Sequence, residues 1–404
     1  MSAVAPPSPA PGRLRVGIVG GGQLARMTYD AAVDLGLDVA VLAQPGDEAV
    51  RGHVPDVTVV DDLHLEVLRR LSARCDVLTF DHEKVAPRHL SALEAEGHVV
   101  RPGAGALTLA VDKAAQRRDL LALGFPVPPF AIADDIATVR RFALRHGWPV
   151  VVKAARGGYD GRGVARVEGP GDLEARTLPF LGRPGDRVVV EPHLAIEREL
   201  AVLVARRSDG SHVVYPVVET HQDASAICRE VWAPAPIDPR VARDATELAV
   251  GIADAIGAVG ILAVELFVVG GELIVNELAA RPHNTGHLTI DAAVTSQFTN
   301  HLRAVLDLPL GATSLLAPAS AMANVIAEGT IDLGAQDVRE VSDLVAGRVA
   351  VHLYGKRSRP GRKVGHVTAL ADDLATARAR ALEAARHLSS RSGGAAPDRL
   401  PVAS

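Results

Sequence analysis

The sequence predicts an α/β domain at the N-terminus followed by two α+β regions, and three observations lead to this fold class. Strand-like and helical segments alternate over 14–103, which is typical of an open, mostly parallel sheet. Two glycine-containing strand–turn–strand segments follow, at 150–167 and 261–278. A smaller unit completes the chain, with strands expected at 321–326 and 349–353.

The bulk composition indicates a globular protein with no general affinity for polyanions. The 43 basic and 48 acidic side chains give a formal net charge of −5, so attraction to nucleic acid or to an anionic membrane is not expected. Cys75 and Cys228 are far apart and suggest neither a zinc motif nor a disulfide framework, which favours a reducing compartment. The N-terminus lacks the features of a signal peptide, and no apolar run is long enough to span a bilayer. A cytoplasmic protein with a disordered tail at 1–13 is expected.

The first domain opens with a strand, a glycine turn and a helix. The turn Gly20–Gly22 precedes a helical spacing of apolar residues that starts at Leu24. Glycines here let a phosphate approach backbone amides at a helix N-terminus. The turn also matches a loose dinucleotide fingerprint, but the next strand ends at Gln44, where an acidic residue would bind ribose hydroxyls. This disfavours an NAD-dependent oxidoreductase, and a purely structural turn remains an alternative. Further strands are expected at 57–60, 76–80 and 98–101.

The middle of the chain begins with a connector and a glycine loop. One helix is predicted within 104–130, with Lys113 on it. The next strand carries Lys153 and is followed by the loop Gly157–Gly163. Such a loop can fold over triphosphate oxygens and supply backbone donors, with Lys153 as the neighbouring cation. An ordinary glycine-rich hairpin is the alternative, weakened by the charged and phenolic side chains in so short a loop.

The stretch 264–287 places two carboxylates in an otherwise apolar hairpin. Strand-like runs flank Gly270-Gly271, which permits a tight turn, and bring Glu265 and Glu277 roughly opposite each other. Two like charges that close repel unless a cation lies between them. Mg²⁺ takes one or two protein carboxylates together with substrate phosphates, so the pair implies a nucleotide as well as a metal. A surface hairpin with solvated carboxylates is the alternative.

A basic loop near the C-terminus stands out in an acidic chain. Its members are Lys356, Arg357, Arg359, Arg362 and Lys363. A single neighbouring aromatic residue and the lack of a broad basic face argue against nucleic-acid binding. A clamp for the phosphate of a small substrate is therefore predicted, followed by a last helix at 373–388.

These features, in this order, resemble the ATP-grasp superfamily, whose members bind ATP between two α+β lobes and activate a carboxylate or bicarbonate by phosphorylation. The resemblance covers almost the whole chain. Three motifs narrow the resemblance: GGYDGRG at 157–163, VNELAARPHNTGH at 275–287 and RPGRKVGH at 359–366. Within the superfamily, they are similar to those of the 5-(carboxyamino)imidazole ribonucleotide synthetase family. Supporting segments are GGGQLARM at 20–27, HQD at 221–223, and SQF and HLRAVLDLPL within 296–310.

The resemblance implies ATP-dependent carboxylation of 5-aminoimidazole ribonucleotide with bicarbonate, through carboxyphosphate, in purine biosynthesis. It implies ATP and Mg²⁺, or Mn²⁺ in its place, as cofactors. It also implies a cytoplasmic homodimer that binds small molecules, with no nucleic acid or membrane partner, and that passes its product to a separate mutase. The implied domains are a biotin-carboxylase-like pre-ATP-grasp domain at 14–103, a two-lobed ATP-grasp domain at 104–312, a small β-rich domain at 313–391 and a flexible tail at 392–404.

Site residues follow from the resemblance, motif by motif. ATP would contact Lys113, Lys153, Gly158, Tyr159, Asp160, Gly161, Arg162, Gly163, Val164, Glu191, Pro192, His193, Leu194, Glu199, His221, Asn276 and Glu277. The metal would be held by Glu265 and Glu277. The ribonucleotide would contact Gly21, Gly22, Gln23, Leu24, Tyr159, Asp160, Arg162, Lys356, Arg362 and Lys363. The catalytic set would be Asp160, Arg281, His283, Asn284 and Lys363, with Arg281, His283 and Asn284 around bicarbonate.

The sequence departs from the family pattern at two places. Asp81 and Lys84 stand where Glu and Asn are usual, and Glu219-Thr220 precede His221 in a shortened loop. The roles of Asp81, Lys84 and His221 are therefore left open.

Two further functions remain as alternatives. A formate-dependent glycinamide ribonucleotide transformylase would share the nucleotide site. A catalytically silent nucleotide-binding regulator would be expected to lack Glu265, Glu277 or Lys153, and all three are present.

Overall fold

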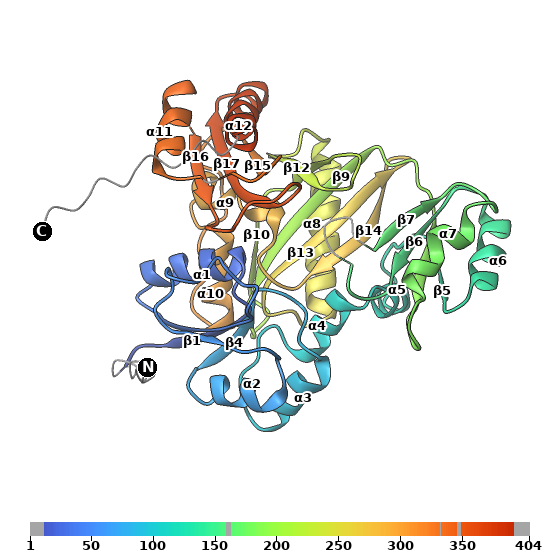
Figure 1. The fold of residues 1–404 in the computed structure, drawn as a ribbon, viewed down its shortest axis with the longest axis horizontal. Helices are drawn as coiled ribbons and strands as arrows, with labels where there is room; N and C mark the ends of the chain where they lie inside the picture. The colour runs from blue at the N-terminus through green and yellow to red at the C-terminus, as the bar shows by residue number, and fades with distance from the viewer. Residues whose placement is uncertain (1–11, 159–162, 332, 346–348, 392–404) are drawn as a thin grey trace, which may run out of the picture.

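The computed structural model describes residues 12–158, 163–331, 333–345 and 349–391, whose strands form three sheets (Figure 1). A parallel sheet lies at the N-terminus, a small antiparallel sheet lies on the far side of the molecule, and a nine-stranded sheet between them continues into the C-terminal region. The predicted combination of α/β and α+β parts is confirmed.

The N-terminal sheet is parallel, with strand order β3-β2-β1-β4. Its elements are β1 (Arg15–Val19), α1 (Gln23–Asp34), β2 (Asp38–Ala43), β3 (Val57–Val59), α2 (Leu65–Ser72), β4 (Val77–Phe80) and α3 (Pro87–Ala95). The strand expected at 98–101 is wrong, because only one bridge forms there, between Leu78 and Val100. Pairing cannot extend: the His98 amide donates to Leu93 O at the end of α3, and Pro102 has no amide hydrogen.

The connector is two helices, α4 (Ala104–Val111) and α5 (Lys113–Ala122), so the single helix predicted here is wrong. Asp112 separates them in an extended conformation and accepts hydrogen bonds from the amides of Ala114 and Ala115. Aspartate stabilises a helix more as an N-cap than in the interior. The break makes Lys113 the first residue of α5.

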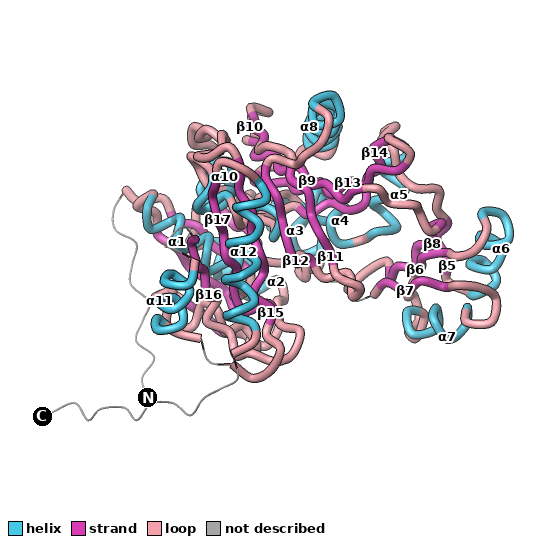
Figure 2. The backbone as a smooth tube through the Cα atoms, turned by 90° about the horizontal axis from the view of Figure 1, so that it is seen from above, coloured by secondary structure: helices cyan, strands magenta, loops and turns pink. Residues whose placement is uncertain are grey.

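The small sheet is antiparallel, with order β5-β8-β6-β7, and stands to one side of the large sheet in both Figure 1 and Figure 2. Its elements are β5 (Ala131–Ala133), α6 (Ile136–His146), β6 (Val150–Ala154), β7 (Val164–Val167), α7 (Leu173–Thr177), a 3-10 turn (Leu178–Phe180) and β8 (Val188–Pro192). Valines of β6 and β8 pack against α6 to form the core of this lobe.

The large sheet runs in the order β14-β13-β9-β11-β12-β15-β17-β16, with β10 also paired to β9. Its strands are β9 (Arg198–Arg206), β10 (His212–Val214), β11 (Val218–Gln222), β12 (Cys228–Ala233), β13 (Gly260–Val269), β14 (Glu272–Ala279), β15 (Ala319–Ile326), β16 (Val349–Leu353) and β17 (Lys363–Ala371). Strands β12 and β15 pair directly, so one sheet spans the domain boundary placed at residue 313. Lys363, expected in a loop, is the first residue of β17.

The remaining helices cover this sheet and join it to the N-terminal domain. They are α8 (Pro239–Ala255), a 3-10 turn (Asn284–Gly286), α9 (Thr289–Ala292), α10 (Gln297–Val305), α11 (Ala335–Leu344) and α12 (Leu374–Ser389). Helix α10 packs against both β13 and α1, and α12 packs on β15 and β17.

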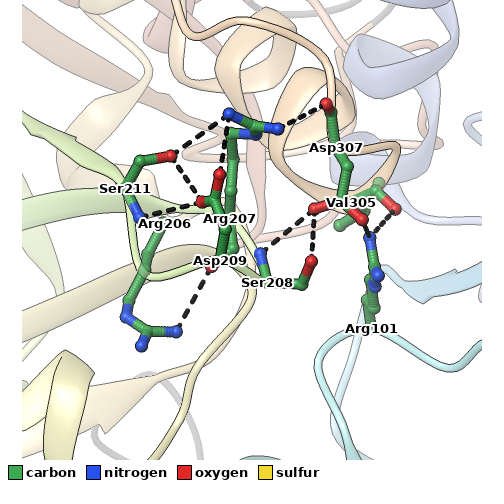
Figure 3. A network of polar contacts seen from close by, with 8 residues as sticks. All are labelled: Arg101, Arg206, Arg207, Ser208, Asp209, Ser211, Val305 and Asp307. Atoms are coloured by element: carbon green, nitrogen blue, oxygen red, sulfur yellow. Dashed lines mark hydrogen bonds and ion pairs between the residues drawn. The ribbon is translucent and has the colours of Figure 1, made fainter.

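A polar network just beyond α10 strengthens the same junction (Figure 3). Asp307 pairs with Arg101 of the N-terminal domain at 2.6 Å and accepts hydrogen bonds from Ser208. Its backbone carbonyl accepts from Arg207 at 2.8 Å. The N-terminal domain is therefore joined to the large sheet through α10 and at the turn between β9 and β10. None of the helices in the described part of the chain is both long and apolar enough to cross a membrane.

Candidate active site

The β13–β14 hairpin aligns the two predicted metal ligands. Gly270 and Gly271 adopt positive φ angles of 58° and 79° at its turn. Glu265 and Glu277 are direct register partners, as expected from the sequence. Their side chains are 27% and 39% exposed, so solvent and small ions can reach both carboxylates.

A β-bulge produces this alignment, and the sequence did not indicate it. The register shifts between Glu265 and Leu266, so that Asn276 is an extra residue in β14. Without this register shift, Glu265 would pair with Asn276, and Glu277 would lie on the opposite face of the sheet. Asn276 instead joins the site: its amide donates to Glu265 at 3.4 Å and its carbonyl oxygen accepts from Lys153 at 3.2 Å.

The pKa values of the two carboxylates are shifted in opposite directions. Burial raises the pKa of Glu265 to about 7, and the charges of Glu277 and Glu199 act in the same direction. Burial would also raise the pKa of Glu277, but Lys113, 2.6 Å away, outweighs it and lowers that pKa. A divalent cation would relieve the repulsion between the two carboxylates, and their oxygen donors fit Mg²⁺.

A buried ion-pair network supports Lys153. Glu191 lies between two cations, 2.8 Å from Lys153 Nζ and 2.5 Å from Arg117 Nε. Burial would raise the pKa of Glu191, but these two charges lower it to about 2. The sequence did not single out Arg117, although its spacing four residues after Lys113 places both on one face of α5. Because the Glu191 side chain is only 4% exposed, contact with a ligand falls to its backbone and to 192–194.

Replacing Glu191 by Gln is expected to lower the free energy of unfolding by about 3 kcal/mol at pH 7, because two buried cations lose their counter-charge. The folded-state pKa of about 2 lies below the ordinary value of 4.5, so this stabilisation is present above pH 4.5 and is lost as the pH falls toward 2. Urea unfolding at several pH values should therefore show a shallower acid dependence for Glu191→Gln than for the wild type. Glu174→Gln, an exposed control, should change stability by less than about 0.5 kcal/mol. Identical acid dependence of Glu191→Gln and wild type would contradict the account.

Other predicted nucleotide residues lie on the same sheet or beside it. Glu199 belongs to β9, next to β13, and burial raises its pKa. His221 of β11 packs its ring on Trp232, with centroids 3.6 Å apart, and lies 3.4 Å from Glu219. Lys153 lies on β6, the strand before the glycine loop, and Gly158 is the second residue of that loop. Gly163, its last residue, has a φ of 86°. Tyr159, Asp160, Gly161 and Arg162 lie outside the described residues.

The loop after β14 brings His283 against the carboxylate pair and holds Arg281 and Asn284 through other partners. His283 Nε2 lies 3.6 Å from Glu265 Oε1. Arg281 pairs with Glu83 of the N-terminal domain at 2.7 Å. The Asn284 amide exchanges two hydrogen bonds with Asn324 of β15, at 3.0 and 2.9 Å.

Gln297 fixes the backbone of this loop from the start of α10. Its side-chain oxygen accepts from His283 N at 2.9 Å, and its amide nitrogen donates to His283 O at 2.8 Å. Gln297, Asn324 and Glu83 support the loop without belonging to the predicted site. Gln297 had a sequence signal as part of the SQF segment, and Glu83 lies between Asp81 and Lys84, where the sequence departs from the family pattern. Asn324 had no such signal.

Carboxylates of the N-terminal domain itself accept hydrogen bonds from the amides of the glycine turn. The amide of Gly21 donates to Asp47 at 3.0 Å, and that of Gly22 donates to Asp81. Asp81 also accepts from the amide of Ala25 at 3.3 Å. Leu24 is buried in the core, so only its backbone could meet a ligand. Lys84 is exposed.

The basic loop meets this turn across the domain boundary. Lys356 Nζ contacts Gln23 Oε1, and Arg362 pairs with Glu48 at 2.9 Å. Lys363 follows at the start of β17. The structure thus brings the predicted phosphate clamp to the predicted first-domain loop.

Comparisons with known proteins agree with this arrangement. Three family models match consecutive parts of the chain: a ribonucleotide synthetase preATP-grasp domain (14–111), an ATP-grasp domain (118–298) and a phosphoribosylaminoimidazole carboxylase C-terminal domain (320–380). The N5-carboxyaminoimidazole ribonucleotide synthase of Mycobacterium tuberculosis is 46% identical over 379 residues, which cover 93% of this chain and 87% of that protein.

Solved structures give the same result. The N5-carboxyaminoimidazole ribonucleotide synthetase of Thermus thermophilus is 36% identical, with a TM-score of 0.82 and coverage of 93% of this chain and 99% of that one. The Aspergillus clavatus enzyme in complex with ADP and 5-aminoimidazole ribonucleotide is 28% identical, with a TM-score of 0.82 and coverage of 93% and 98%.

Proposed function

Because this chain belongs to the N5-carboxyaminoimidazole ribonucleotide synthase family of ATP-grasp enzymes, it carboxylates 5-aminoimidazole ribonucleotide at the expense of ATP, and we propose how its residues divide that reaction. The product, N5-carboxyaminoimidazole ribonucleotide, is the carboxylated ribonucleotide that the sequence motifs implied. The reaction belongs to purine biosynthesis. The observation that carries the residue assignment is the contact of His283 with Glu265, because it joins the bicarbonate loop to the carboxylate pair.

Bicarbonate is the carboxyl donor in this proposal. One of its oxygens attacks the γ-phosphorus of ATP, the bond to ADP breaks, and carboxyphosphate forms. The carboxyl group then passes to the amine of the ribonucleotide, which loses a proton while inorganic phosphate leaves. Phosphoryl transfer of this kind depends on positioning and charge neutralisation more than on a protein nucleophile.

ATP lies between the small sheet and the large one. Lys113 and Lys153 bind its phosphates, and 191–194 with Glu199 hold the adenosine. The 158–164 loop, of which 159–162 lie outside the described residues, is assigned to the same phosphates. Mg²⁺ bound by Glu265 and Glu277 would neutralise charge on the phosphates during transfer. The ion pairs Lys113–Glu277 and Lys153–Glu191 hold the two lysines ready for this role.

Bicarbonate lies beside the carboxylate pair. Arg281 and Asn284 orient it, each held by a partner from another part of the chain, Glu83 and Asn324. His283 carries a proton to or from the reacting oxygens, since its Nδ1 bonds Thr285 and its Nε2 faces the site.

The ribonucleotide lies between the glycine turn and the basic loop, with its phosphate at the basic loop, because the amides of Gly21 and Gly22 are already bonded to Asp47 and Asp81. Replacing Lys363 by Met is expected to raise KM for 5-aminoimidazole ribonucleotide about 10- to 100-fold, because a charge-assisted contact to phosphate is lost. KM for ATP should stay within about twofold. Arg243→Met, which removes an exposed arginine on α8, is the control and should leave both constants unchanged. A larger effect on ATP than on the ribonucleotide would reassign Lys363 to the nucleotide.

A substrate matrix tests the assignment against its nearest alternative. The purified protein should form ADP with 5-aminoimidazole ribonucleotide and bicarbonate, and not with glycinamide ribonucleotide and formate. Formate dependence would instead identify a transformylase, and absence of any ATPase activity would favour the silent regulator.

The remaining assignments rest on the family. We propose a cytoplasmic homodimer that uses Mg²⁺, or Mn²⁺ in its place, and passes the carboxylated product to a separate mutase. Sedimentation at working concentration tests the dimer.

A further inference from the structure

Three side chains meet beside the large sheet, outside the site described above. Asp291 comes from α9, His352 from β16 and His366 from β17, and one ligand atom of each lies within 4.8 Å of the other two. His352 and His366 are direct register partners, and their ring centroids are 4.6 Å apart. His352 Nε2 lies 2.9 and 3.1 Å from the two Asp291 oxygens.

His366 has the surroundings of a metal ligand. Its ring is completely buried, and its Nδ1 lies 2.9 Å from the Tyr354 hydroxyl. Its Nε2 is buried with no hydrogen-bond partner among the residues that the structure describes. A buried imidazole nitrogen without a partner is costly, and ligand histidines are commonly oriented by a hydrogen bond at the other nitrogen. Burial also lowers the pKa of His366, which keeps the ring neutral and able to bind a metal.

We propose that Asp291, His352 and His366 bind a divalent transition-metal ion, with Zn²⁺ as the best-matched ion. Two imidazoles and one carboxylate suit Zn²⁺, Co²⁺ or Ni²⁺, whereas Mg²⁺ prefers oxygen ligands alone. Bonds of about 2.0–2.2 Å would place neighbouring ligand atoms about 3.3 Å apart, close to the present Asp291–His352 spacing. Asp291 and His352 are 20% and 29% exposed, so an ion can enter from solvent and a water can complete the coordination.

The position of this metal site gives it a structural role. Asp291 follows the bicarbonate loop in the chain, and His366 lies three residues beyond Lys363 of the clamp. A bound ion would cross-link the segment after the bicarbonate loop to the two strands that carry the clamp. It would stabilise the folded chain through binding, independently of ATP.

Metal binding is tested with tag-free, full-length protein stripped with a chelator and then titrated with Co²⁺, followed by visible absorption and by metal analysis after dialysis. One equivalent should bind in the Glu277→Gln background, where the carboxylate pair is disabled, and Zn²⁺ should displace it. Added to that background, Asp291→Asn and His352→Gln should each weaken Co²⁺ binding at least about 10- to 100-fold.

His53→Gln is the matched control, because His53 also pairs with a carboxylate, Asp30, at 2.7 Å but forms no three-ligand group among the residues described. It should leave Co²⁺ binding unchanged. Melting curves of the metal-free proteins verify that each variant is folded. If one of Asp291→Asn and His352→Gln does not fold, the Co²⁺ affinity of the other is sufficient to test the metal site. Unchanged binding in a folded ligand variant, or no stoichiometric binding in the parent protein, would overturn the metal site and leave the His352–Asp291 contact as an ordinary ion pair.

Discussion

Replacing Glu277 by Gln is expected to lower kcat/KM for ATP-dependent carboxylation by about 10³-fold. The substitution keeps the shape of the side chain but removes the charge that pairs with Lys113 at 2.6 Å. It also removes the member of the carboxylate pair that stays ionised, so that Mg²⁺ loses its stronger ligand. ADP release at saturating bicarbonate and ribonucleotide, measured over a range of Mg²⁺ concentrations, gives the effect.

Glu272→Gln is the control for this substitution, because Glu272 lies on the same strand and is exposed. It should retain activity within about twofold. If Glu277→Gln kept more than a tenth of the wild-type kcat/KM, Glu277 would have no place in the metal site.

Replacing His283 by Ala is expected to reduce bicarbonate-dependent ADP release about 10²- to 10⁴-fold, the range for loss of a positioned proton carrier. The ring lies 3.6 Å from Glu265. Gln297 bonds both the backbone N–H and the backbone C=O of His283, so removal of the ring need not disturb the loop. KM for ATP should change little, because His283 is assigned to bicarbonate and not to the nucleotide.

His212→Ala, an exposed histidine on β10, is the matched control and should leave the rate unchanged. An unaltered rate in His283→Ala would exclude His283 from proton transfer and leave Arg281 as the main group around bicarbonate.

The sequence predicted those features that depend on local patterns. The glycine turn and the flanking apolar runs gave the β13–β14 hairpin and brought Glu265 close to Glu277, whereas their direct pairing depends on the bulge. Alternating strands and helices gave the parallel N-terminal sheet. In both cases the signal lies within a few residues of the feature itself.

Features that depend on distant contacts were missed. The bulge at Asn276 adds one residue without changing the composition of its strand, and the pairing of β12 with β15 joins segments about 90 residues apart. Asp112 was read as part of a helix, although its side chain caps the next one. Arg117 and Asn324 have meaning only through Glu191 and Asn284, which are far from them in the chain.

Transfer of a bicarbonate oxygen to phosphate is the most direct test of the reaction proposed here. The enzyme is mixed with ATP, 5-aminoimidazole ribonucleotide and ¹⁸O-labelled bicarbonate, and the inorganic phosphate is analysed by mass spectrometry before the label exchanges with water. Attack by bicarbonate on the γ-phosphorus predicts one ¹⁸O in each phosphate formed, together with one carboxylated ribonucleotide. Phosphate without label, formed as fast as the product, would contradict a carboxyphosphate intermediate and with it the assignment of Arg281, His283 and Asn284.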